Sequence, residues 1–123
     1  MSRWIVDGMN VIGSRPTGWW RDRPGAMRRL VEELEAFAER SGDEVTVVFD
    51  GKPFDLESDS VDVMFASRRG RNAADDDIAA LVENNPEPGE LSVVTSDADL
   101  AGRVRAAGAT VVGAGQFRHR LDG

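Results

Sequence analysis

The chain of 123 residues is 41% hydrophobic and 30% charged, carries a formal net charge of −7 and contains no cysteine. This length suffices for one domain with a single buried core, and the composition is typical of a globular protein. Disulfides and thiolate metal sites are excluded, and the negative charge argues against a protein that holds nucleic acid by bulk electrostatic attraction. We therefore expect a single domain over residues 1–123.

No targeting or membrane segment is predicted. The chain enters a strand-like run directly after Arg3, without the charged-then-apolar leader that marks a secretion signal. Nowhere does an apolar stretch approach the roughly 20 residues of a membrane span. We expect a cytoplasmic protein that does not bind a membrane.

The first predicted strand is a short, continuous apolar run over residues 4–6, of the kind that is covered on both faces of a sheet. It ends on Asp7, and Asn10 follows three residues later. A carboxylate at this point is expected to face solvent or a ligand. Residues 11–23 contain two glycines and a proline but no apolar period, and they predict a long loop.

Helices and strands alternate along the rest of the chain. Apolar residues at helical spacing predict helices between Pro24 and Ser41, over residues 74–82 and over residues 97–107. Apolar, β-branched runs predict strands over residues 45–49, 61–66, 91–95 and 109–112. The strand over residues 109–112 is the last predicted element.

This alternation predicts an α/β fold, a three-layer sandwich in which a mostly parallel, five-stranded sheet is covered by helices on both faces. Ligands bind such sheets beyond the carboxyl ends of the strands. Asp7, Asp50 and Asp97 each follow the apolar run of a predicted strand. We therefore expect these three carboxylates to share one edge of the sheet, although aspartate is also common in turns and at helix starts.

Helical-wheel positions separate the acids near the last predicted helix. At about 100° per residue, Asp97 shares the sheet-facing side with Leu100 and Val104, whereas Asp99 points away from it. We expect Asp97 to be a ligand. Asp99 is a second candidate, but Ser96 as N-cap and Asp99 three residues later are close to a capping box, so Asp99 should serve mainly in capping.

The same test sorts the three consecutive acids at residues 75–77. Asp76 lies opposite the apolar face of its helix and should be solvated, whereas Asp75 and Asp77 flank that face and either one can lean over the strand ends. The alternative is that all three acids stabilise the N-terminus of the helix, with Asn72 as its cap.

Several carboxylates that converge without histidine or cysteine form a site of hard oxygen ligands, which suits Mg²⁺ or Mn²⁺. Without a metal, such a group of acids repels itself and raises its own pKa values. A cation held in this way activates water and offsets charge on a phosphodiester. Asn10 is placed to position the attacking water or to bind a phosphate oxygen.

Four segments closely resemble the NYN domains, in particular the bacterial YacP-like branch of the PIN-like ribonuclease superfamily. They are Asp7-Gly8-Met9-Asn10-Val11-Ile12, Val47-Val48-Phe49-Asp50, Ala74-Asp75-Asp76-Asp77-Ile78 and Val93-Val94-Thr95-Ser96-Asp97. The segments occur in this order over nearly the whole chain. One departure is Met9, which stands where the family often has an aromatic residue.

The resemblance implies a parallel sheet of order 3-2-1-4-5 and metal-dependent cleavage of RNA that leaves 5′-phosphate and 3′-hydroxyl ends. Asp7, Asp75 and Asp97 match the family's metal-binding acids, Asn10 its partner amide, and Asp50 the acid of its second strand. The expected catalytic set is therefore Asp7, Asn10, Asp50, Asp75 and Asp97. The expected ligands of Mg²⁺ or Mn²⁺ are Asp7, Asp75, Asp97 and, as a weaker candidate, Asp99.

Arginine and tryptophan side chains outside this group are candidate RNA contacts. They are Arg15, Trp19, Trp20, Arg21, Arg68, Arg69 and Arg71. Aromatic rings can stack on unpaired bases and arginine can bind phosphate. The alternatives are a tryptophan pair folded back as a hydrophobic lid and, for the last three arginines, a solvated turn.

We interpret the sequence as that of a metal-dependent endoribonuclease acting on RNA as a monomer or weak homodimer, with the ribosome as a further candidate partner. A non-catalytic RNA- or ribosome-binding module that retains the fold is the main alternative. A receiver-type phospho-acceptor would want a lysine after the last strand, where Gly113-Ala114-Gly115-Gln116 stands instead. A structure-specific DNA nuclease would need a helical arch insertion, which the sequence lacks.

Overall fold

A five-stranded sheet forms the centre of the computed structural model, which describes residues 2–68, 70 and 72–123. The strands are β1 (Arg3–Asp7), β2 (Glu44–Phe49), β3 (Asp62–Phe65), β4 (Leu91–Val94) and β5 (Thr110–Val112). Their order is β3-β2-β1-β4-β5, and every pairing is parallel. The predicted α/β architecture and strand order are confirmed, and the sheet is parallel throughout rather than mostly parallel.

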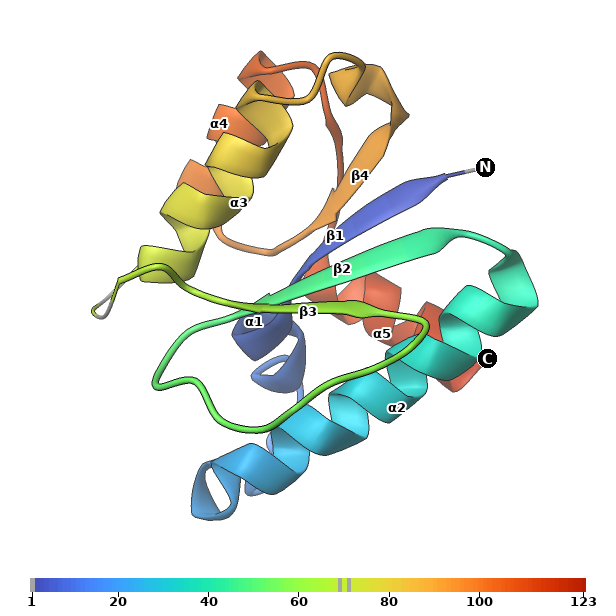
Figure 1. The fold of residues 1–123 in the computed structure, drawn as a ribbon, viewed down its shortest axis with the longest axis vertical. Coiled ribbons are helices and arrows are strands. Elements are labelled where there is room, and N and C mark those ends of the chain that lie inside the picture. The colour runs from blue at the N-terminus through green and yellow to red at the C-terminus, as the bar shows by residue number, and fades with distance from the viewer. Residues whose placement is uncertain (1, 69, 71) are drawn as a thin grey trace.

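Helices cover both faces of the sheet (Figure 1). One face carries α1 (Gly8–Ile12), α2 (Arg23–Ser41) and α5 (Ala114–Asp122), and the other carries α3 (Ala73–Glu83) and α4 (Ala98–Ala106). Short 3-10 turns, η1 (Trp19–Arg21) and η2 (Pro88–Glu90), precede α2 and β4. Among the described residues, none of these helices combines the length and the hydropathy of a membrane span.

Side chains along the central strand β1 alternate between the two cores. Trp4 and Val6 lie in the core that includes α2 and α5, whereas Ile5 lies in the core that includes α3 and α4. Because successive side chains of a strand point to opposite faces, Asp7 belongs to the face of Ile5. The last side chain of β1 therefore points towards the side of the sheet that α3 covers.

The structure corrects the sequence prediction at two places. Residues 11–23 are not one long loop, because they contain the end of α1 and all of η1. The helix α5 was not predicted, although its Ala114, Phe117 and Leu121 are buried. Gly113 precedes this helix and Gly115 lies in its first turn. Because glycine has a low helix propensity, the short apolar period of α5 did not indicate a helix.

A close contact forces glycine at the point where β1 turns into α1. A Cβ atom on Gly8 would lie 2.5 Å from two ring atoms of Phe49 and 3.0 Å from Cγ2 of Val47. The Phe49 ring is completely buried in the core. The absence of a side chain at residue 8 thus lets α1 start directly on the sheet, which brings Asn10 close to the end of β1.

We expect Gly8→Ala to lower the free energy of unfolding by about 1–3 kcal/mol, because the added methyl group overpacks the core. Gly102→Ala is the matched control. Gly102 also lies in a helix, but none of the described atoms beyond its own helical neighbourhood would approach its Cβ within 4 Å. Alanine there should raise the free energy of unfolding by up to about 1 kcal/mol. Urea unfolding followed by circular dichroism measures both, and a Gly8→Ala variant as stable as the wild type would contradict the prediction.

Candidate active site

Four aspartates line one hollow at the carboxyl end of the sheet. They come from the ends of β1 and β2 and the starts of α3 and α4, and they are Asp7, Asp50, Asp75 and Asp97. Met9, Asn10 and Asn72 complete the lining of this hollow, whose volume is about 230 Å³. We call it the acidic hollow. The structure therefore brings together the acids that the strand ends and the helical wheel predicted.

Asp7 forms the floor of the acidic hollow and is 5% exposed. The Oγ1 atom of Thr95 donates a hydrogen bond to Oδ2 of Asp7 at 3.1 Å, and the same hydroxyl accepts one from the backbone N–H of Asp97 at 3.1 Å. Thr95 is almost completely buried between them. It thus links the first acid to the segment that carries the last one, a role that the sequence did not reveal because Thr95 resembles an ordinary strand residue.

Asn10 fixes α1 against the loop after β4. Its Oδ1 atom accepts a hydrogen bond from the backbone N–H of Ser96 at 2.8 Å. The Oγ atom of Ser96 in turn accepts one from the N–H of Ala114 at 2.9 Å, which anchors the start of α5. The Asn10 amide NH₂ group is therefore the part of the side chain that is left to donate to a phosphate oxygen or a water molecule.

Asp50 and Asp97 each cap a helix with one carboxylate oxygen. Oδ1 of Asp50 accepts from the N–H of Ala74, and Oδ1 of Asp97 accepts from the N–H of Leu100, both at 2.9 Å. The cap position predicted for Asn72 is confirmed, whereas the cap predicted at Ser96 is wrong. Asn72 occupies the cap position of α3 without a side-chain hydrogen bond, and Asp97, not Ser96, is the cap of α4. Each cap leaves the second carboxylate oxygen available for another ligand.

The three consecutive acids of α3 have separate environments. Asp75 lines the acidic hollow, whereas Asp76 is exposed and pairs with Arg68 and with Arg103, the latter at 2.8 Å. Asp77 accepts hydrogen bonds from the backbone N–H and the hydroxyl of Ser67, at 2.7 and 2.8 Å. Asp75 is thus the member of the trio that reaches the strand ends. Asp76 points outwards as predicted, but it is ion-paired.

Burial and mutual repulsion raise the pKa values of two of these acids. The pKa of Asp7 rises from 3.8 to about 7, chiefly because the carboxylate is buried and further because Asp75 and Asp50 are close. The Thr95 hydroxyl and the nearby backbone N–H of Asn10 lower the pKa of Asp7, without offsetting the effect of burial. Burial and the charges of Asp97, Asp50 and Asp76 raise the pKa of Asp75 to about 6. The positive charge of Arg103 lowers the pKa of Asp75 but, among the described residues, does not offset burial and the neighbouring acids.

The donor set of the acidic hollow fits a divalent cation with several water ligands. Within residues 2–68, 70 and 72–123, no three acidic or histidine side chains are arranged to hold one ion by themselves. Mg²⁺ usually binds through one or two carboxylates and keeps several waters. The hollow offers four carboxylates, an amide and space for a hydrated ion. All of its ligands would be oxygen atoms, which also suits Mn²⁺.

The remaining candidate residues that the structure describes lie outside the acidic hollow. Asp99 is exposed on α4 and does not line it. Arg15 forms an ion pair with Asp122, and Arg68 pairs with Asp76. Arg69 and Arg71 lie outside the described residues.

The two tryptophans of η1 differ in their surroundings. Trp19 is partly buried against the hydrophobic core, whereas Trp20 is 58% exposed. Their rings meet edge to face, with centroids 5.9 Å apart. Arg21, the next residue, is exposed. The tryptophan pair is therefore not folded back as a whole.

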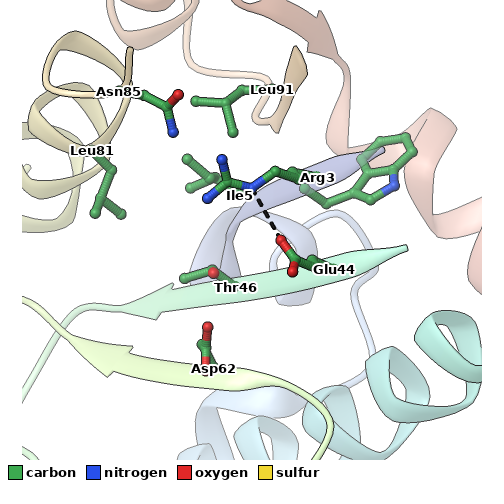
Figure 2. Close-up of a pocket in the computed structure, with 9 residues that line it drawn as sticks. Arg3, Ile5, Glu44, Thr46, Asp62, Leu81, Asn85 and Leu91 are labelled. Atoms are coloured by element: carbon green, nitrogen blue, oxygen red, sulfur yellow. Dashed lines mark ion pairs between the residues drawn. The ribbon is translucent and has the colours of Figure 1, made fainter. Parts of the chain in front are cut away.

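A second pocket lies at the opposite end of the strands (Figure 2). Its volume is about 100 Å³, and its lining includes the first residues of four strands, Arg3, Glu44, Asp62 and Leu91. The guanidinium of Arg3 pairs with Glu44 at 3.1 Å, and Ile5, Leu81 and Leu91 form apolar walls. This pocket does not gather unpaired acids, so the acidic hollow is the better candidate for an active site.

The fold and the acids at its carboxyl edge define a parallel α/β protein with an acidic site at the strand ends. The YacP-like NYN domain family model matches residues 4–123, and the chain belongs to this family. A crystal structure of Rae1 (YacP) from Bacillus subtilis is similar, with a TM-score of 0.79 and 25% identity over 99% of this chain and 74% of that chain. A mutant of the same protein gives a TM-score of 0.83 and 25% identity over 99% of this chain and 76% of that chain. Comparison with curated proteins gave no match.

Two substitutions of Asp50 distinguish its role as a helix cap from the effect of its charge. We expect Asp50→Ala to lower the free energy of unfolding by about 1 kcal/mol, because α3 loses the acceptor at its N-terminus. Asp50→Asn retains an acceptor and removes a charge that raises the pKa values of Asp7 and Asp75. Its stability in metal-free buffer should equal or exceed that of the wild type. Urea unfolding tests both variants, and equal losses for alanine and asparagine would contradict a capping role.

Protonation of Asp7 should make stability depend on pH. An unfolded chain loses this proton near pH 3.8, whereas folded Asp7 keeps it up to about pH 7, so the folded state binds more protons in between. The free energy of unfolding in metal-free buffer should therefore fall as pH rises through this interval, and Asp7→Asn should remove a part of the fall on the order of 2 kcal/mol. Urea unfolding at pH 5 and pH 8 measures the effect. The same pH dependence in wild type and Asp7→Asn would contradict it.

Proposed function

We propose that this domain is a metal-dependent endoribonuclease whose active site is the acidic hollow. The observation that supports this proposal most directly is the convergence of Asp7, Asp50, Asp75 and Asp97 on one hollow, with raised pKa values at Asp7 and Asp75. If these four acids had only a structural role, we would expect each to be ion-paired with a basic side chain, as Asp76 is with Arg68 and Arg103. Membership of the YacP-like NYN family, with its ribonuclease-type fold, makes RNA the proposed substrate.

In this proposal Asp7, Asp75 and Asp97 would hold Mg²⁺ or Mn²⁺ together with water ligands, so that not all three carboxylates need bind the ion directly. A bound divalent cation would supply an activated water molecule and offset the charge that develops on the phosphodiester during in-line displacement. Its positive charge would also favour the ionised form of each carboxylate. The acids would then be anionic at neutral pH despite their burial.

Asn10 and Asp50 complete the proposed catalytic set. Because Oδ1 of Asn10 is held by the N–H of Ser96, its NH₂ group has a fixed direction from which to donate to the substrate phosphate or the attacking water. Asp50 holds the first turn of α3 in place, and the next residue after the capped Ala74 is Asp75. Asp50 thus positions a proposed metal ligand and adds negative charge beside it.

The proposed partner is RNA, with the ribosome as a further candidate and the cytoplasm as the proposed location. A non-catalytic RNA-binding module is the alternative from another class. The two proposals differ in one observable, because the module binds RNA without cleaving it under any metal condition.

We expect the wild type to cleave RNA, but not DNA of the same sequence, with Mn²⁺ or Mg²⁺ and to be inactive with EDTA. Asp7→Asn should lower the cleavage rate at least about 100-fold, because loss of an inner metal ligand should exceed the roughly 10–100-fold effect of an outer-shell change. Asp99→Asn is the matched control, because Asp99 lies in the first turn of the helix that Asp97 caps but outside the acidic hollow.

Gel analysis of end-labelled RNA measures the rates, and circular dichroism verifies that each variant is folded. Undiminished cleavage by Asp7→Asn, or equal cleavage with EDTA, would contradict the proposed site. Binding without cleavage under every condition would favour the non-catalytic module.

A further inference from the structure

The segment between α1 and α2 presents one aromatic ring to solvent. Trp20, at 58%, is the exposed large hydrophobic side chain within the described part of the chain. A single exposed apolar residue is common on protein surfaces and by itself indicates nothing. Three further features distinguish this ring: a rigid support, an excess of arginine around it, and a connection to the acidic hollow.

The ring of Trp20 rests on an ordered support. Trp19 packs against the core and meets the Trp20 ring edge to face, at an interplanar angle of 82°. The turn is closed by hydrogen bonds from the N–H of Arg21 to the carbonyl of Gly18 at 3.0 Å and from the N–H of Asp22 to that of Trp19 at 3.2 Å. Gly18 adopts φ of +77°, which a glycine accepts without strain. A ring held in this way loses little conformational entropy when a flat ligand stacks on it.

The charge around Trp20 is opposite to that of the whole protein. Residues 15–29 contain five arginines and one aspartate, in a chain with a net charge of −7, and of the five Arg15 is ion-paired with Asp122. Arg21 and Arg23 flank the tryptophan in sequence, and both are exposed. Aromatic rings interleaved with arginines bind single-stranded nucleic acid through base stacking and phosphate contacts. An apolar peptide would not need this positive charge, so a nucleotide fits the surface better.

Arg23 connects the tryptophan to the acidic hollow. Its Nη2 atom donates to the backbone carbonyl of Asp50 at 3.4 Å, and the Asp50 side chain lines the hollow. Trp20 precedes Arg23 by three residues, so their Cα atoms lie within about 11 Å of each other. The ring therefore belongs to the same segment as an arginine that contacts the backbone of a hollow-lining residue.

We propose that Trp20 stacks on an unpaired base of the RNA whose phosphodiester lies in the acidic hollow, with Trp19 as the support of the ring and Arg21 and Arg23 as phosphate contacts. This inference rests on the proposed ribonuclease function. Arg15 has a different role, because its guanidinium is paired with Asp122. The tryptophan pair thus divides into one substrate contact and one structural residue.

Binding to RNA in the Asp7→Asn background tests the proposal without cleavage. The probes are a fluorescently labelled single-stranded RNA and a strand of the same length that carries abasic sites. Trp20→Ala should weaken binding of the intact RNA about tenfold, the size expected for one base stacked on an aromatic ring. Trp20→Phe should stay within about threefold of the parent, because the ring is kept. On the abasic strand, Trp20→Ala and its parent should bind equally.

Intrinsic fluorescence gives a second readout in the same titration. Stacking on the Trp20 ring should quench emission in the parent, and the quenching should be reduced in both Trp20→Ala and Trp20→Phe. An unchanged Kd in Trp20→Ala, or an equal loss on intact and abasic strands, would overturn base stacking. A lower Tm of Trp20→Ala together with weaker binding of both strands would also overturn it, since Trp20 would then be structural.

Steady-state cleavage by otherwise wild-type protein separates this inference from the proposed function. Trp20→Ala should raise KM about tenfold and leave kcat within about twofold, the pattern for a contact made equally in ground and transition states. If the protein cleaves RNA and Trp20→Ala changes neither KM nor kcat, the stacking contact is overturned and the proposed nuclease function stands. If RNA binding depends on Trp20 but no metal supports cleavage, the stacking contact stands and the proposed nuclease function is overturned.

Discussion

Burial of the Asp7 carboxylate at the end of the central strand is the interaction on which the acidic hollow depends. β1 lies between β2 and β4, so its last residue is surrounded by the neighbouring strand ends. Water cannot solvate the charge there, and nearby acids disfavour it further, which raises the pKa of Asp7 to about 7. The Thr95 hydroxyl offsets only part of this effect. The folded protein therefore carries an unfavourable charge distribution that a proton or a divalent cation relieves.

Helix N-termini make this concentration of acids compatible with a stable fold. Asp50 caps α3, Asp97 caps α4, and Asp7 immediately precedes α1. The partial positive charge of each terminus favours a nearby carboxylate. Capping and metal binding were competing interpretations of these aspartates, but each cap uses only one carboxylate oxygen. The same side chains can fix the helices and present a second oxygen to the hollow.

The arginines differ in their interaction partners. Arg15 pairs with Asp122, Arg68 and Arg103 pair with Asp76, and Arg118 pairs with Glu33. Arg23 instead donates a hydrogen bond to the backbone carbonyl of Asp50, whose side chain lines the acidic hollow. Clusters of arginine in the sequence therefore do not identify a nucleic-acid surface by themselves. The contact of Arg23 beside the hollow is the reason why we propose the segment around Trp20 as the approach of the RNA.

The sequence by itself determined the alternation of helices and strands, the common edge of Asp7, Asp50 and Asp97, and the outward direction of Asp76. These features follow from periods of two and 3.6 residues, which are local properties of the chain. The family resemblance added the strand order. Only the tertiary structure decided that Asp97 rather than Ser96 caps α4, that Asn10 holds Ser96, and that Trp19 is covered while Trp20 is exposed. The physical reason is that the Asn10 hydrogen bond joins residues 86 apart and the burial of Trp19 depends on the packed core, and no local period encodes such partners. At α4, Ser96 and Asp97 are both residue types that cap helices, so the sequence alone does not separate them.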